Sequence, residues 1–162
     1  MYTDEILRCL EAFALEPDVA VVYQHHRLAA YQAAFDDLKD LGLLYSCHCS
    51  RKSLPRGPYP GFCAHRLGQP LDEQWAIRMD ATDLDPCVDD LLLGAQHTER
   101  PGDLIVRRRD GLFAYQLACA VDEHLDQVTH VIRGIDLLES TPMQRLIASK
   151  LNYHRPSYGH FP

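Results

Sequence analysis

The chain has 162 residues, of which 46% are hydrophobic and 24% charged, and its formal net charge at pH 7 is −7. This length supports one domain with a core and a small appendage, in the composition range of soluble globular proteins. No apolar run is long enough to span a membrane. The acidic balance argues against broad, sequence-independent nucleic-acid binding, which requires a basic face.

The first 45 residues predict two helices and two strands. Residues 4–15 and 26–41 carry apolar side chains at helical spacing, and Gly42 ends the second of these helices. The β-branched run at 19–23 predicts a strand, and residues 43–45 predict another. We expect inward-facing side chains from both helices: Ile6, Leu7, Leu10, Phe13 and Ala14 in the first, and Leu28, Tyr31, Phe35, Leu38 and Leu41 in the second.

The second half alternates strands and helices. Strands are predicted at 75–79, 103–107 and 112–115, with a hairpin turn at Asp110-Gly111 whose tip carries the basic run 107–109. A helix follows over 115–122, then a buried strand over 128–132 and a last helix that opens at Thr141-Pro142. This order predicts an α/β fold with a mostly parallel sheet. Arg133 then follows an apolar strand, where such sheets bind ligands.

Residues 46–73 are rich in Pro and Gly and predict no regular structure. A segment this long without secondary structure is unusual in a compact domain. The segment contains Cys47, Cys49 and Cys63, and a bound metal ion would supply the folding energy that keeps it ordered. Zinc takes four ligands tetrahedrally, and a site closed by protein ligands is structural.

The identity of the fourth ligand stays open at this level. His48, Tyr59 and His65 all compete, and histidine is the commoner zinc ligand. A disulfide framework or buried thiols are the alternative interpretations of the cysteines. The polar N-terminal residues predict no signal peptide, which favours a reducing compartment and therefore metal over disulfide. Three further cysteines lie in apolar or helical contexts and are expected in the interior: Cys9, Cys87 and Cys119.

Several short segments stand out, in order along the chain. They are YQHHR at 23–27 with Tyr31, YSCHCSR at 45–51, YPGFC at 59–63, FAYQLA at 113–118, VDE at 121–123, VIRGIDLL at 131–138, STPMQ at 140–144 and HFP at 160–162. Together they resemble the glutamyl-Q tRNA(Asp) synthetases, small relatives of the glutamyl-tRNA synthetase catalytic domain. The Cys-x-Cys and Tyr-x-x-x-Cys pieces narrow the resemblance to this branch.

This resemblance implies a cytoplasmic ligase that activates glutamate with ATP and Mg²⁺ and transfers it to queuosine in the anticodon of tRNA(Asp). It implies a partial Rossmann-like class I synthetase core with an inserted zinc-binding subdomain. The implied zinc ligands are Cys47, Cys49, Tyr59 and Cys63. The implied glutamate-binding residues are Tyr115 and Arg133. A guanidinium can bind a carboxylate bidentately, and a phenol can add an oriented hydrogen bond.

The resemblance also implies that the chain is an internal fragment. Class I synthetases carry a His-x-Gly-His-type loop and a Lys-Ser-Lys-type loop that contact ATP, and neither motif occurs in this sequence. We therefore expect residues 1–45 to form part of the nucleotide-binding fold, 46–74 the zinc-binding insertion, and 75–162 the remainder of the insertion and of the core. The alternatives are a non-catalytic zinc-bound interaction module and a fragment of a glutamyl-tRNA synthetase.

Overall fold

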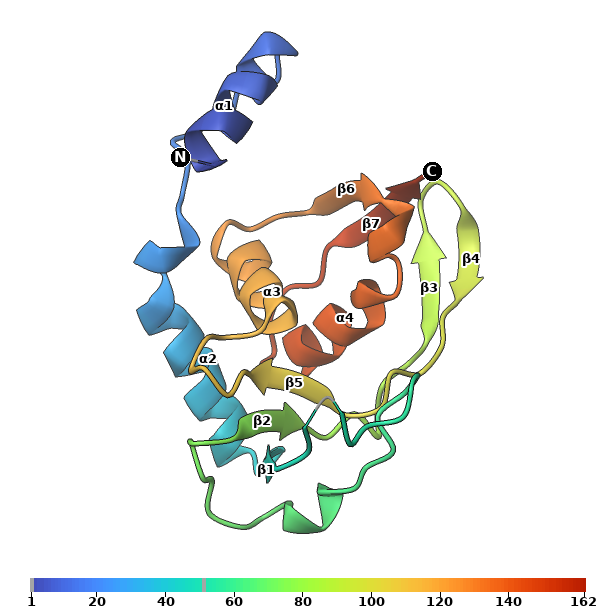
Figure 1. The fold of residues 1–162 in the computed structure, drawn as a ribbon. Helices are drawn as coiled ribbons and strands as arrows, with labels where there is room; N and C mark the ends of the chain where they lie inside the picture. The colour runs from blue at the N-terminus through green and yellow to red at the C-terminus, as the bar shows by residue number, and fades with distance from the viewer. Residues whose placement is uncertain (1, 51) are drawn as a thin grey trace.

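The computed structural model describes residues 2–50 and 52–162, which form two β-sheets packed with α-helices (Figure 1). The helices of this part of the chain are α1 (Tyr2–Ala12), α2 (Leu28–Asp40), α3 (Tyr115–Leu125) and α4 (Ser140–Lys150), with short 3-10 turns η1 (Gln24–His26), η2 (Ala64–Arg66) and η3 (Ile135–Leu137). None of these helices is both long and apolar enough to cross a membrane.

The first sheet is antiparallel and lies against the main core. It consists of β1 (Leu44–Cys47), β2 (Ala76–Met79) and β5 (Leu104–Arg107), in the order β1-β2-β5. Apolar side chains of this sheet pack with those of α2, α3 and α4, and examples are Phe35, Ile77, Val106, Leu117 and Ile147. The sheet thus anchors β1, whose last residue is Cys47, to the most buried part of the molecule.

The second sheet is mixed. It contains β3 (Cys87–Asp90), β4 (Gly94–His97), β6 (His130–Gly134) and β7 (Ser157–Phe161), in the order β4-β3-β7-β6. Strand β7 is parallel to both of its neighbours, β3 and β6, whereas β4 is antiparallel to β3. The α/β class is confirmed, but the expectation of a mostly parallel sheet is wrong, because parallel pairing is confined to β3, β7 and β6.

The N-terminal segment differs most from the prediction. Residues 19–23 form no strand, and Val19 and Val22 are 78% and 51% exposed. The apolar face predicted for residues 4–15 is also open, with Ile6 59% and Phe13 79% exposed, and Figure 1 shows α1 set apart from the two sheets. A β-branched run needs a neighbouring strand for its backbone hydrogen bonds, and the described residues offer none to 19–23.

The other helices follow their predicted positions with smaller corrections. In α2, Tyr31, Phe35 and Leu38 are buried as predicted, whereas Leu28 and Leu41, the residue after the helix, are exposed. The last helix begins at Ser140, one residue before the predicted start. The proposed division of the chain at residues 45 and 74 stays a prediction.

The strands depart from the prediction in burial and in number. The predicted buried strand 128–132 corresponds to β6, but its Ile132 is 56% exposed. Strands β3, β4 and β7 were not predicted, because they are short and rich in polar residues.

The turn at Asp110-Gly111 is confirmed by the backbone. The N–H of Arg108 donates to the carbonyl of Leu112 at 2.8 Å, and the strand predicted at 112–115 is reduced to one bridge between Arg107 and Phe113. The guanidinium of Arg109 lies 4.4 Å from the centroid of the Trp75 ring. The basic run therefore lies at the end of β5 and the hairpin tip, and one of its arginines packs on Trp75, just before β2.

A network of side-chain hydrogen bonds joins the start of α2 to α3. The carboxylate of Asp122 accepts hydrogen bonds from Gln24 at 3.0 Å, Arg27 at 3.0 Å and the hydroxyl of Tyr31 at 2.8 Å. The guanidinium of Arg27 also bonds Asp126 one turn further along. Because these partners are about 95 residues apart in the chain, they fix the orientation of α3, whose first residue is Tyr115.

Candidate metal centre and amino-acid site

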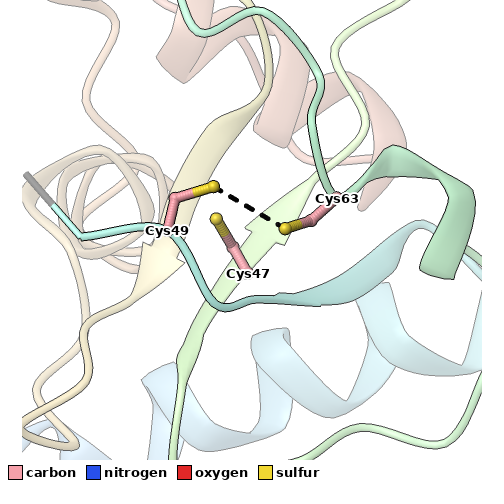
Figure 2. A group of neighbouring side chains, drawn as sticks. All are labelled: Cys47, Cys49 and Cys63. Atoms are coloured by element: carbon pink, nitrogen blue, oxygen red, sulfur yellow. Dashed lines mark hydrogen bonds between the residues drawn. The ribbon is translucent and has the colours of Figure 1, made fainter. Parts of the chain in front are cut away.

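Three cysteine thiols meet where β1 leaves the first sheet. The Sγ atoms of Cys47, Cys49 and Cys63 all lie within 4.8 Å of one another, and those of Cys49 and Cys63 are 3.7 Å apart (Figure 2). Zn–S bonds of about 2.3 Å in tetrahedral geometry place sulfur ligands about 3.8 Å apart. The three thiols therefore fit three corners of a zinc site.

The hydroxyl of Tyr59 lies beside these sulfurs. Its oxygen is 3.4 Å from Cys47 Sγ and 4.0 Å from Cys49 Sγ, and it accepts the backbone N–H of Cys63 at 3.0 Å. The Tyr59 backbone is held by a hydrogen bond to the carbonyl of Pro101 at 2.8 Å. A Cβ atom on the neighbouring Gly102 would lie 2.3 Å from the Tyr59 carbonyl oxygen, so only glycine permits this approach.

The two competing histidines lie differently. Within the described residues, the candidate metal group consists of the three cysteines and includes neither His48 nor His65. The His48 ring stacks on Trp75 with centroids 4.4 Å apart, and its buried Nε2 has no hydrogen-bond partner in the part of the chain that the structure describes. This arrangement favours Tyr59 as the fourth ligand, and the ligand set stays a prediction.

A buried arginine shapes the charge around the thiols. Arg78, in β2, is 6% exposed, and its guanidinium carbon lies 3.6 Å from the centroid of the Tyr59 ring. Burial opposes ionisation of Cys47, but hydrogen bonds from Tyr59 and Arg78 outweigh it and lower the pKa of this thiol. Burial and the adjacent sulfurs raise the pKa of Cys49 to about 11. A divalent cation would remove the repulsion that keeps these thiols from ionising together.

The second candidate site lies between α3 and the second sheet. Tyr115, the first residue of α3, is 47% exposed. Arg133 lies within β6, one residue before its end, rather than beyond the strand as the sequence suggested. Burial and the thiol of Cys119 raise the pKa of Tyr115, while the charge of Arg133 acts in the opposite direction. The structure thus brings both predicted glutamate-binding residues into one electrostatic environment.

Around this site lie further polar groups to which the sequence analysis assigned no role. Cys119 is partly buried, which raises the pKa of its thiol to about 11. Gln144, on α4, is fully buried, and neither polar atom of its amide has a hydrogen-bond partner among the described residues. An unsatisfied buried amide is costly. The position of Gln144 in the STPMQ segment was the only sequence signal for it.

The three cysteines outside the metal cluster were expected in the interior. Cys119 is partly buried, whereas Cys9 and Cys87 are exposed.

Glu123 is another such group, and it gives a testable pH dependence. Its carboxylate accepts a hydrogen bond from the hydroxyl of Tyr158 at 2.8 Å. Burial raises the pKa of Glu123, and the bond from Tyr158 and the charge of Arg133 only partly counteract it. The ionised carboxylate is therefore penalised in the folded protein. This penalty is absent below the unfolded pKa of about 4.3 and complete above the raised folded pKa.

We expect Glu123→Gln to raise the melting temperature at pH 8, and this gain to shrink as the pH falls towards 4. The amide keeps an oxygen for the Tyr158 hydroxyl but carries no charge to desolvate. Thermal unfolding across this pH range measures the effect, with the exposed Glu99→Gln as the control. A gain that grew towards acid would contradict the raised pKa of Glu123.

The comparison with protein families decides the lineage. Residues 65–162 match the family described as tRNA synthetases class I (E and Q), catalytic domain. The matched region contains β2 to β7 with α3 and α4, and therefore includes both Tyr115 and Arg133. The chain belongs to this family. The resemblance that the motifs indicated is confirmed at the level of the class I E and Q catalytic domain.

Curated relatives narrow the similarity. A protein of Pseudomonas entomophila named glutamyl-Q tRNA(Asp) synthetase is 44% identical over 164 residues, covering 98% of this chain and 55% of the relative. One of the same name from Dechloromonas aromatica is 44% identical over 175 residues, covering 98% of this chain and 57% of the relative. The chain thus spans about half the length of the curated relatives it matches.

Solved structures share the fold. A glutamate tRNA ligase from Elizabethkingia meningosepticum, crystallised in complex with its amino acid, superposes with a TM-score of 0.78 at 20% identity. The match covers 98% of this chain and 39% of that ligase. A glutamate-tRNA synthetase from Elizabethkingia anophelis gives a TM-score of 0.79 at 20% identity, with the same coverage. These likenesses establish the class I synthetase catalytic fold for this chain.

Proposed function

We propose that this chain is part of a glutamyl-Q tRNA(Asp) synthetase, a ligase that activates glutamate with ATP and transfers it to queuosine in the anticodon of tRNA(Asp). The 44% identity to relatives of that name over nearly the whole chain carries this proposal. Activated transfer requires ATP with Mg²⁺, and tRNA places the reaction in the cytoplasm. In the family, the triphosphate is contacted by the His-x-Gly-His-type and Lys-Ser-Lys-type loops, and neither motif occurs in this sequence.

In this proposal Arg133 binds a carboxylate of glutamate and Tyr115 orients the substrate. A guanidinium carries five N–H donors. Arg133 directs Nε to His160 at 3.1 Å and Nη2 to Thr141 at 2.8 Å and to the carbonyl of Leu137 at 3.4 Å. Its Nη1 makes no hydrogen bond to a described residue, so two donors are left for a substrate carboxylate.

Zinc would have a structural role, held by Cys47, Cys49, Cys63 and Tyr59. Such an ion, once bound, links the end of β1 to the irregular segment and supplies folding energy. The three sulfurs and one phenolic oxygen provide four donors at separations that suit tetrahedral coordination. Arg78 would partly balance the negative charge of a site with three thiolates, because its guanidinium lies over the Tyr59 ring.

The proposal is tested by following labelled glutamate. The complete gene product that contains this chain is incubated with ATP, Mg²⁺, labelled glutamate and tRNA(Asp) that either carries or lacks queuosine. We expect label only in the queuosine-containing tRNA, and nuclease cleavage should recover it in the anticodon fragment. Label at the acceptor end would instead assign the chain to a glutamyl-tRNA synthetase, and the absence of any transfer would favour a non-catalytic zinc-bound module.

A further inference from the structure

A buried carboxylate–imidazole pair lies beside Arg133 in the second sheet, and the proposed metal and ATP chemistry does not use it. The carboxylate of Asp90, the last residue of β3, is 2.6 Å from Nδ1 of His160 in β7, and both side chains are fully buried. The carboxylate of Asp90 also accepts the backbone N–H groups of Leu92, Leu93 and His160, at 2.9, 2.9 and 3.1 Å.

This arrangement keeps Asp90 ionised. Burial alone would raise the pKa of Asp90, but the hydrogen bonds from His160 and from the three backbone N–H groups outweigh burial and lower it. Placing a charge in a sheet interior is costly unless it is fully hydrogen-bonded. Apolar residues would fill the same space at less cost, so the pair calls for a role that packing does not supply.

The other nitrogen of His160 points to that role. Arg133 Nε donates to His160 Nε2 at 3.1 Å, and an arginine stays protonated throughout the working pH range. A nitrogen that accepts an N–H carries no proton, so Nε2 is the bare nitrogen of the ring. The proton of a neutral His160 is therefore on Nδ1, where Asp90 accepts it. The carboxylate thus selects the tautomer that can accept from Arg133.

The sheet register makes this chain of contacts continuous. Strand β7 lies between β3 and β6 (Figure 1). In the parallel pairing of β6 with β7, His160 is directly opposite Arg133. Thr141, fully buried at the start of α4, completes the setting: its hydroxyl oxygen lies 2.8 Å from Arg133 Nη2 and 3.3 Å from His160 Nε2. The guanidinium is thereby fixed by two strands and a helix.

We propose that Asp90 and His160 act as a positioning pair for Arg133, fixing the plane of its guanidinium so that the free Nη1 edge faces the substrate carboxylate. Neither residue touches the substrate. The inference rests on the proposed role of Arg133 in binding glutamate. An oriented fork loses less side-chain entropy when it binds. Outer-shell partners of metal ligands change affinity or activity by about 10–100-fold when removed, and we expect an effect at the lower end of this range here.

The tautomer provides a direct test on the chain itself. In ¹⁵N NMR spectra of the labelled protein, we expect His160 to show a protonated Nδ1 and a bare Nε2, with a coupling across the hydrogen bond to Arg133 Nε. In Asp90→Asn, the amide can donate to Nδ1, so the proton should move to Nε2 and the coupling should disappear. The exposed neighbour Asp89→Asn is the matched control and should leave the spectrum unchanged. A proton on Nε2 in the unsubstituted protein would overturn the proposal.

Kinetics then separate positioning from structure. In the complete gene product, Asp90→Asn and His160→Asn should raise the KM for glutamate about tenfold with little change in kcat. His160→Gln, whose amide oxygen can replace Nε2 as an acceptor, should stay within about threefold of the parent. If Asp90→Asn fails to fold, the two His160 variants decide: equal KM values for them would overturn the proposal.

The KM of Arg133→Ala shows whether the proposed glutamate-binding role or only the positioning pair has failed. An unchanged KM in Arg133→Ala would overturn the proposed glutamate-binding role. A raised KM in Arg133→Ala together with an unchanged KM in Asp90→Asn would overturn the positioning pair alone.

Discussion

Replacing Cys63 with serine is expected to release zinc and open the irregular segment between β1 and β2. The purified parent chain should contain one zinc ion, and the variant should contain much less. Structural zinc contributes about 10–16 kcal/mol in small peptides. A loss of only about 3 kcal/mol would raise the population of the opened segment more than about 100-fold. Limited proteolysis measures this directly, because cleavage should concentrate between residues 48 and 75.

The control for this experiment is Cys87→Ser. Cys87 is exposed and far in sequence from the candidate metal group, so its replacement should change neither zinc content nor the cleavage pattern. Chelation of the parent chain should reproduce the Cys63→Ser pattern. Tyr59→Phe tests the fourth ligand, because it keeps the ring beneath Arg78 but removes the oxygen. If the parent chain were metal-free and its thiols reacted freely with alkylating agents in the native state, zinc would have no place in this fold.

The parts of this fold that sequence predicts well are those with local causes. The periodic apolar residues of α2 place Tyr31, Phe35 and Leu38 in the core, and the Asp110-Gly111 turn specifies its own hairpin. The cysteine cluster was equally accessible, because a single residue separates Cys47 from Cys49 and a Pro-Gly turn precedes Cys63. In each case a short sequence pattern marks the feature, even where its contacts reach further along the chain, as between Cys49 and Cys63.

The parts that sequence misses depend on distant partners. The run at 19–23 has the composition of a strand but no strand beside it, and the apolar face of α1 has no described surface to pack on. Composition reports the capacity of a segment to pair, whereas pairing requires a partner. Strands β3 and β7 are the converse case: they are short and polar, but each pairs within the second sheet.

The same limit applies to the candidate amino-acid site. Arg133 and Tyr115 could be singled out by motif, but the contacts that orient Arg133 are not local. Arg133 and His160 are separated by 27 positions in the chain, and His160 and Asp90 by 70. Only the register of β3, β7 and β6 brings these residues together. Nothing in the local sequence of Asp90 distinguishes it from the exposed Asp89 beside it.

Arg133→Ala is expected to raise the KM for glutamate by about 10–100-fold in the complete gene product. A hydrogen bond between charged groups is worth about 1.5–3 kcal/mol, and each 1.4 kcal/mol changes an equilibrium constant tenfold. A main effect in KM would indicate that Arg133 binds the side-chain carboxylate, which the reaction does not alter, whereas an equal loss in kcat would indicate the α-carboxylate that is activated. Steady-state kinetics with varied glutamate at saturating ATP measure it.

Two further arginine variants sharpen this test. Arg133→Lys keeps the charge but loses the planar fork, so it should recover only part of the affinity, because an ammonium cannot bond His160, Thr141 and a carboxylate in one plane. Arg108→Ala removes an equal charge from the exposed hairpin and should leave KM unchanged. If lysine restored the full affinity, then charge alone would suffice at this position. The network that orients the guanidinium would then serve the packing of the second sheet instead of the substrate.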